Sequence, residues 1–92
     1  MKIYKNQSLI KIVLETGIAS LSGATTLQIL YKKPDGTSGN WTATANGTAL
    51  EYNVQNNDID QDGNWQLQAY VVIGGRNGYG EKTTLRVDPT FN

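Results

Sequence analysis

Short segments in which hydrophobic and polar residues alternate recur along the chain, and a helical period of 3.6 is sustained nowhere. The alternation is clearest in residues 65–73, where every second side chain is apolar or small. Shorter segments with the same pattern are residues 10–14, 27–32, 41–45, 48–54 and 83–87. Within each segment the alternation places on one face Ile10, Ile12 and Leu14; Leu27, Ile29 and Tyr31; Trp41, Ala43 and Ala45; and Leu50, Tyr52 and Val54. Trp65, Leu67, Ala69, Val71 and Ile73 form one row that is expected to face the interior, and Thr83, Leu85 and Val87 match it on the last strand. A period of two is that of a β-strand, so the pattern predicts an all-β protein.

Turn-forming residues separate these segments. Pro34-Asp35-Gly36 combines a residue that presets φ with one that accepts a positive φ. Asn46-Gly47 is the dipeptide preferred in type I′ turns, and it predicts a hairpin between residues 41–45 and residues 48–54. The expected strands are therefore antiparallel neighbours.

A second hairpin is predicted near the end of the chain. The glycine-rich residues 74–80 are expected to form its loop, which joins residues 65–73 to residues 81–87. Residues 2–4 are expected to form a short edge strand. The chain would then have about seven strands with a turn every 8–12 residues or so, which is the spacing of a small antiparallel sandwich.

The residues around the start of the longest segment indicate the immunoglobulin arrangement of such a sandwich. The small residue Gly63 is followed two positions later by the aromatic Trp65, and Leu67 stands where immunoglobulin domains place a cysteine. We therefore expect residues 1–92 to form a single domain, an all-β, immunoglobulin-like antiparallel β-sandwich of about seven strands.

The composition narrows the functional classes. The chain has no cysteine and no histidine, which excludes nucleophile–histidine catalysis within this chain and zinc sites built on thiolates. Eight basic side chains balance eight acidic ones, so the chain lacks the basic excess that neutralises phosphates. No apolar segment is long enough to span a bilayer. We expect a protein that is not an enzyme, holds no cofactor and binds neither nucleic acid nor a membrane.

One acidic segment resembles the start of an EF-hand calcium loop. Asp58, Asp60 and Asp62 provide oxygen ligands at positions one, three and five, and Gly63 follows as the turn residue. Position twelve, which should be a bidentate Glu, is Ala69. The alternative interpretation is a structural corner before the central strand, with the Asp side chains making local turns. We favour the corner and keep the three carboxylates as a weak metal candidate.

The outward face of the central strands is the strongest candidate for a binding surface. If the strand order is that of an immunoglobulin domain, the alternation brings together Leu30, Gln68, Tyr70, Val72 and Tyr79. This group is apolar and aromatic at its centre, a composition that protein interfaces favour. We predict that it is a protein–protein interface, although single exposed apolar side chains are also normal on any surface.

A carbohydrate-binding module is the alternative function. Such modules stack sugar rings on exposed aromatic side chains, and Trp41, Tyr70 and Tyr79 are the available rings. Trp41 shares its face with Ala43 and Ala45, so it is either a core residue or an exposed ring.

Three motifs resemble a known family. They are Leu21-Ser22-Gly23-Ala24, Lys33-Pro34-Asp35-Gly36 and Gly63-Asn64-Trp65. Together, over about residues 10–87, they are similar to small bacteriophage structural proteins, notably the N-terminal domain of baseplate upper proteins from phages of Gram-positive bacteria.

The resemblance implies an immunoglobulin-like virion module that attaches a tail or baseplate component to its neighbours. It implies phage structural proteins, or further copies of the same chain, as partners. It also implies a location in the virion, and in the host cytoplasm during assembly. It supplies no catalytic residues.

Overall fold

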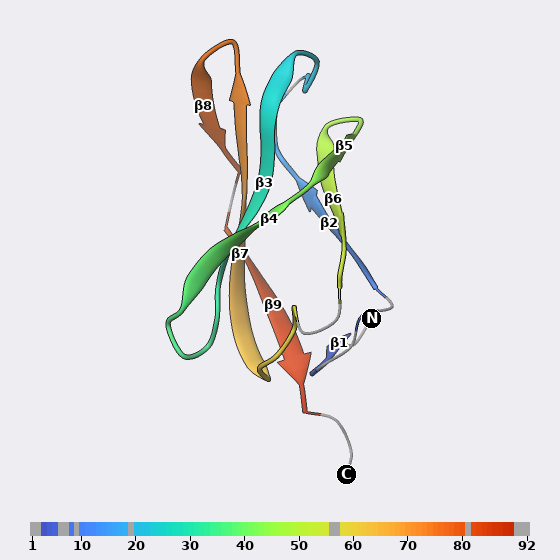
Figure 1. Cartoon of the computed structure of the whole chain (residues 1–92), viewed down its shortest axis with the longest axis vertical. Helices are drawn as coiled ribbons and strands as arrows, with labels where there is room; N and C mark the ends of the chain where they lie inside the picture. The colour runs from blue at the N-terminus through green and yellow to red at the C-terminus, as the bar shows by residue number, and fades with distance from the viewer. Residues whose placement is uncertain are drawn as a thin grey trace.

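The computed structural model describes residues 3–5, 8, 10–18, 20–55, 58–80 and 82–89, and the regular structure in these residues is all β (Figure 1). Its strands are β1 (Ile3–Tyr4), β2 (Lys11–Glu15), β3 (Ala24–Lys32), β4 (Ser38–Thr42), β5 (Thr44–Asn46), β6 (Ala49–Asn53), β7 (Gly63–Ile73), β8 (Arg76–Tyr79) and β9 (Thr83–Asp88). No helix in the described residues is long and apolar enough to cross a membrane.

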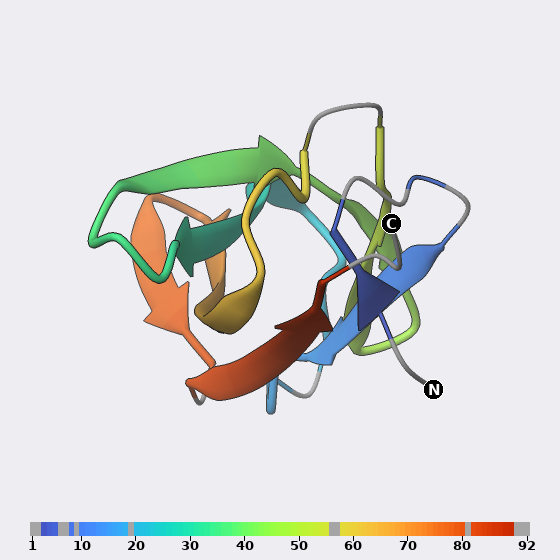
Figure 2. The same cartoon turned by 90° about the horizontal axis from the view of Figure 1, so that it is seen from below.

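The strands form two sheets that face each other (Figure 2). The larger sheet has the order β1-β9-β7-β3-β4, with β8 also paired to β7, and the smaller sheet has the order β2-β6-β5. All pairs are antiparallel except β1 with β9. The protein is therefore an all-β sandwich of two facing sheets, and the predicted fold class is confirmed.

The strand count exceeds seven for two reasons: one long strand is divided between the two sheets, and Arg76–Tyr79 forms the additional strand β8. β4 pairs with β3 in the larger sheet, and β5 pairs with β6 in the smaller one. Between them, the Ala43 N–H donates to the Leu27 carbonyl at 2.9 Å. Trp41 and Ala43 are buried, so Trp41 is a core residue and not an exposed ring, whereas Ala45 is exposed because the chain has by then passed to the smaller sheet. The crossing strand closes this side of the sandwich.

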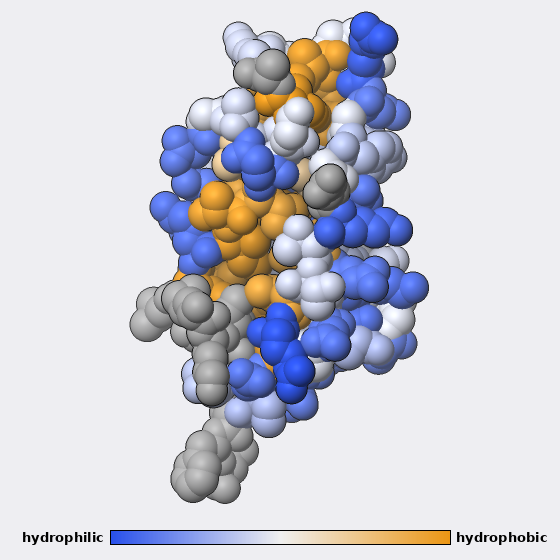
Figure 3. All heavy atoms as spheres, turned by 180° about the vertical axis from the view of Figure 1, so that it is seen from behind, coloured by the Kyte–Doolittle hydropathy of each residue, from blue (hydrophilic) through white to orange (hydrophobic). Residues whose placement is uncertain are grey.

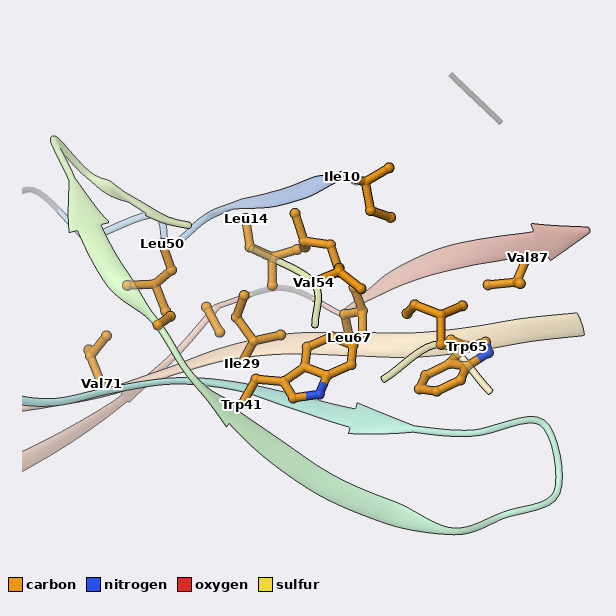
Figure 4. Packing of buried hydrophobic residues seen from close by; sticks show 14 of the residues in the cluster. Ile10, Leu14, Ile29, Trp41, Leu50, Val54, Trp65, Leu67, Val71 and Val87 are labelled. Atoms are coloured by element: carbon orange, nitrogen blue, oxygen red, sulfur yellow. The ribbon is translucent and has the colours of Figure 1, made fainter. Parts of the chain in front are cut away.

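The core lies between the sheets and is centred on the row that alternates along β7. Trp65 is fully buried, and Leu67, Ala69 and Val71 are at most 2% exposed. Core side chains from the two sheets point toward one another (Figure 4). Among the other predicted core residues, Thr83 is exposed, at the end of β9. The alternation of β7 therefore predicted the interior correctly.

The second hairpin differs from the prediction. Residues 74–80 were expected to form an open loop, but the turn is only Gly74-Gly75, with φ of 58° and 78°, and Arg76–Tyr79 is strand β8. The Gly80 N–H continues the pairing by donating to the Ala69 carbonyl at 3.0 Å. Strands β8 and β9 thus pair with successive parts of β7. The polar and glycine-rich sequence of β8 hid this strand, and Glu81 lies outside the described residues.

The first hairpin is confirmed, but its turn lies one residue further along. Asn46 pairs with Ala49 as the last residue of β5, so the turn residues are Gly47 and Thr48 rather than Asn46-Gly47. Gly47 has φ of 64°, the conformation that favours glycine. The Asn46 side chain instead donates to a Glu51 carboxylate oxygen at 2.7 Å, and the alternation pattern could not predict this contact.

The short edge strand is confirmed over Ile3–Tyr4. Ile3 pairs with Val87 and Tyr4 with Asp88, which makes β1 an edge of the larger sheet. Lys2, the other predicted member of this strand, lies outside the described residues.

Candidate functional site

The five predicted interface residues lie on one outer face of the larger sheet. Leu30 of β3 is directly opposite Gln68 of β7, and Tyr70 of β7 is directly opposite Tyr79 of β8. Val72 lies two residues beyond Tyr70 on the same face. We call this surface, formed by Leu30, Gln68, Tyr70, Val72 and Tyr79, the Tyr70 face. The prediction that these residues share a surface assumed that β3 and β7 are neighbours, and the structure has this strand order.

Two tyrosine rings form the aromatic part of the Tyr70 face. Their centroids are 5.0 Å apart and their planes are tilted by 46°. Tyr79 is 59% exposed, whereas Tyr70 is half-buried beneath it. The pair thus presents one raised ring and one recessed ring to solvent.

A shallow groove of about 150 Å³ adjoins the aliphatic end of the Tyr70 face. It is lined by Leu30, Tyr31, Lys32, Gln66, Leu67, Gln68 and Lys82. The Gln68 amide donates to the Gly80 carbonyl at 2.9 Å, which fixes this side chain across the gap between β7 and the start of β9. The lining contains two lysines and no carboxylate, so the groove combines apolar side chains with positive charge.

The acidic segment before β7 is held by bonds within the chain. The Asp58 carboxylate accepts hydrogen bonds from the Tyr52 hydroxyl and from the Gln55 N–H, the latter at 2.7 Å. Burial, together with the bond to Asp58, raises the pKa of Tyr52 above its ordinary value. Asp58 therefore closes the turn after β6 and anchors a tyrosine that lies against the core.

Asp60 is paired with a lysine. The Lys33 Nζ lies 3.0 Å from the Asp60 carboxylate, and 5.6 Å from the centroid of the Trp65 ring. The hydrogen bond to Asp60 raises the pKa of Lys33 above its ordinary value. This contact joins the turn after β3 to the segment before β7.

Ile59, between the two carboxylates, is fully buried, and sequence reasoning missed it because its neighbours are acidic. The Trp65 indole N–H donates to the Gln61 carbonyl at 3.0 Å, as the tyrosine of an immunoglobulin corner bonds back to the chain before it. We call residues 58–65, which this bond ties together, the Trp65 corner.

Among the described residues, no group of three or more acidic side chains is arranged to hold a metal ion. The geometry favours the structural corner over a calcium loop.

The aromatic rings proposed for sugar stacking do not form one platform. Trp41 is only 6% exposed and stacks on Tyr52 inside the sandwich, with centroids 5.0 Å apart and planes 5° apart. Tyr70 and Tyr79 remain at the surface, but their 46° tilt prevents them from presenting one flat surface to a sugar.

Comparison of the chain with protein-family models, curated proteins and solved structures found no significant match.

Proposed function

We propose that this protein is a non-catalytic binding module that docks onto a protein partner through the Tyr70 face. The observation that carries the proposal is the meeting of Leu30, Tyr70, Val72 and Tyr79 on one outer sheet face, beside the groove at Leu30. Tyrosine is enriched among the residues that dominate binding energy at interfaces, and charged side chains are depleted at interface centres. The Tyr70 face has both properties.

The shape of this surface supports a protein partner. The exposed Tyr79 ring projects from the sheet, whereas the groove beside Leu30 is a recess. A partner would place a side chain in the recess and pack against the raised ring. Lys32 and Lys82 in the lining of the groove favour a partner with acidic groups as well as apolar ones.

Four of the carboxylates that the structure describes are held by partners within the chain, which supports a non-catalytic role. Asp58 and Asp60 are bound by Tyr52 and Lys33. The pKa of Glu51 is lowered, first by the hydrogen bond from Asn46 and then by the nearby Lys11. Glu15 accepts a hydrogen bond from Thr48. A general acid near neutral pH needs a raised pKa, and Glu51 is shifted the other way.

The biological setting that we propose is a bacteriophage virion, as a tail or baseplate component. This part of the proposal rests on the resemblance of the turn motifs, namely those at Gly23, at Pro34-Asp35-Gly36 and at Gly63-Asn64-Trp65. The immunoglobulin-like sandwich agrees with it but is shared by many proteins with other roles.

Incorporation into particles tests the proposal. In the organism that encodes the protein, we would replace it by Leu30→Asp, by Tyr70→Asp, or by Thr44→Asp as a control on the exposed outer face of the other sheet. We expect the wild type and Thr44→Asp to co-sediment with purified virions, and the two Tyr70-face variants to be lost from them. Circular dichroism melts would establish that all three variants fold.

Two results would each contradict a different part of the proposal. Equal incorporation of all variants would show that the Tyr70 face is not the docking surface. Absence of the wild-type protein from virions would remove the virion setting.

A further inference from the structure

Strand β2 has one edge that no strand covers in the described part of the chain. It pairs only with β6, whereas β1 pairs with β9 in the other sheet. Its side chains alternate, with Ile12 and Leu14 buried and with Lys11, Val13 and Glu15 exposed. Val13 is 56% exposed, although it is a β-branched apolar residue in the middle of an edge strand. An edge strand of this kind is a template for pairing with another strand.

The backbone of β2 offers hydrogen-bonding groups on that open edge. The Ile10 carbonyl accepts from the Val54 N–H at 3.0 Å, and the Thr16 N–H donates to the Thr48 carbonyl at 3.2 Å, so residues of even number direct these groups to β6 and its flanks. Successive residues of an antiparallel strand direct their N–H and C=O groups to opposite sides. Lys11, Val13 and Glu15 therefore direct theirs away from β6.

We propose that β2 pairs with β2 of a second copy of this chain, in an antiparallel arrangement around a two-fold axis at Val13. In that register the two Val13 residues lie opposite each other and exchange backbone hydrogen bonds. Lys11 of each copy lies opposite Glu15 of the other, on the same face. The two smaller sheets would join into one continuous sheet.

The charges on β2 indicate a second copy rather than an unrelated strand. Lys11 and Glu15 lie at equal distances on either side of Val13, so an antiparallel copy of the same strand places opposite charges together at both ends by symmetry. The whole chain has a net charge of zero, so two copies do not repel each other. The dimer would use the smaller sheet and leave the Tyr70 face free, so it extends the proposed function without depending on it.

The surroundings of β2 have space for an added strand. A groove of about 320 Å³ is lined by residues 13–17 and Thr83, beside the open edge of β2. Seen from behind, apolar side chains gather along the middle of the molecule, with polar side chains on either side (Figure 3). At the Glu15 end, a Cβ added to Gly80 would lie 3.4 Å from the carbonyl oxygens of Glu15 and Thr16. Gly80 therefore lies against the Glu15 end of the open edge, and the part of the edge that an added strand could use ends there.

Such a dimer is weak, because a pair of five-residue strands buries less than the roughly 1,200 Å² at the lower limit of a standard interface. We expect a dissociation constant on the order of 10–1000 µM. Sedimentation velocity at protein concentrations up to about 1 mM would detect it, and added salt should weaken it because the charge pairs are exposed.

Charge reversal tests the register directly. Lys11→Glu makes both charged positions of β2 acidic, and Glu15→Lys makes both basic. We expect each variant alone to dimerise at least about tenfold more weakly than the wild type, because both cross-strand attractions become repulsions. An equimolar mixture of the two variants should form a heterodimer, because each acidic position then faces a basic one.

Each outcome decides the proposal. Dimerisation of the wild type and the mixture, but not of either variant alone, supports it. A wild type that stays monomeric at 1 mM, variants that dimerise as well as the wild type, or a mixture that stays monomeric would each overturn it. Lys11 lies 3.5 Å from Glu51 in its own chain, so thermal melts of both variants would establish that they remain folded. Tyr70→Asp, which should abolish docking in the proposed function, should leave this dimer unchanged.

Discussion

Replacing Trp65 by Phe should destabilise the protein through the loss of one hydrogen bond as well as through the loss of packing. The indole is fully buried, and its N–H donates to the Gln61 carbonyl at 3.0 Å. Phenylalanine keeps an aromatic ring in the core but has no donor. The substitution therefore removes the bond that ties the segment before β7 to the strand itself.

The magnitude follows from two contributions. Loss of the donor costs about 1–3 kcal/mol if the Gln61 carbonyl is left without a partner. The smaller ring leaves a partial cavity that costs roughly 1 kcal/mol more. For a domain of this size, about 1 kcal/mol lowers the melting temperature by roughly 4–8 °C. We expect a total loss of roughly 2–4 kcal/mol in the free energy of unfolding.

Trp41→Phe is the matched control. Trp41 is 6% exposed and lies in the same aromatic cluster, with its ring centroid 6.1 Å from that of Trp65. Within the part of the chain that the structure describes, its indole N–H has no hydrogen-bond partner in the protein. Urea unfolding followed by circular dichroism should show Trp65→Phe to cost about 1–3 kcal/mol more than Trp41→Phe, which is the donor contribution alone. Equal costs for the two variants would refute a stabilising role for the Trp65 corner.

The other predictions concern the same corner and the ionisable groups. In a double-mutant cycle, Asp58→Ala and Tyr52→Phe should show a coupling energy of about 1 kcal/mol, and additive losses would mean that their hydrogen bond stabilises nothing. Gly63→Ala should lower the melting temperature measurably, because Gly63 has φ of 125°. Acid should lower the free energy of unfolding as the pH falls below the ordinary pKa values of Asp35 and Glu51, 3.8 and 4.5, because folding lowers both. Alkali should lower the free energy of unfolding as the pH rises above 10, the ordinary pKa of Tyr52, because folding raises that pKa and the unfolded state ionises first. Urea unfolding at a series of pH values measures both effects. A flat profile in either pH range would contradict these shifts. Millimolar calcium should not shift the melting temperature, and a rise of several degrees would restore the calcium-loop interpretation.

Much of the fold could be predicted because alternation and burial are the same physical constraint in a sandwich. A strand with one face in the core must place an apolar side chain at every second position, and the row from Trp65 to Val71 does so without interruption. The predicted outer face followed from the same parity. Once β3 and β7 are neighbours, Leu30 and Tyr70 necessarily share a surface.

The errors arose where local chemistry gave no alternation. Arg76–Tyr79 forms a strand because it pairs with β7, although its own residues are mostly polar and include a glycine. Ile59 lies in a segment without regular structure, so no period marks it, yet it is fully buried. The position of the turn at Gly47-Thr48 depends on pairing across the hairpin, which the Asn46-Gly47 dipeptide alone does not determine. Tertiary pairing determined each of these features.

The candidate surfaces were predictable to different degrees. The Tyr70 face follows from strand parity and order. The open edge of β2 could not be predicted, because it depends on which sheet β1 joins, and β1 pairs with β9 rather than with β2. The symmetry of Lys11 and Glu15 around Val13 is visible in the sequence, but it acquires meaning only when that edge is known to be uncovered.

Photo-crosslinking from position 70 is the most direct test of the claim that the Tyr70 face meets another protein. A benzophenone amino acid would replace Tyr70, or Thr44 on the other sheet as the control, in the organism that encodes the protein. We predict that position 70 forms a covalent adduct with one or a few structural proteins and that position 44 does not form the same adduct. An identical pattern from both positions, or no adduct from position 70 while particles assemble normally, would contradict the account.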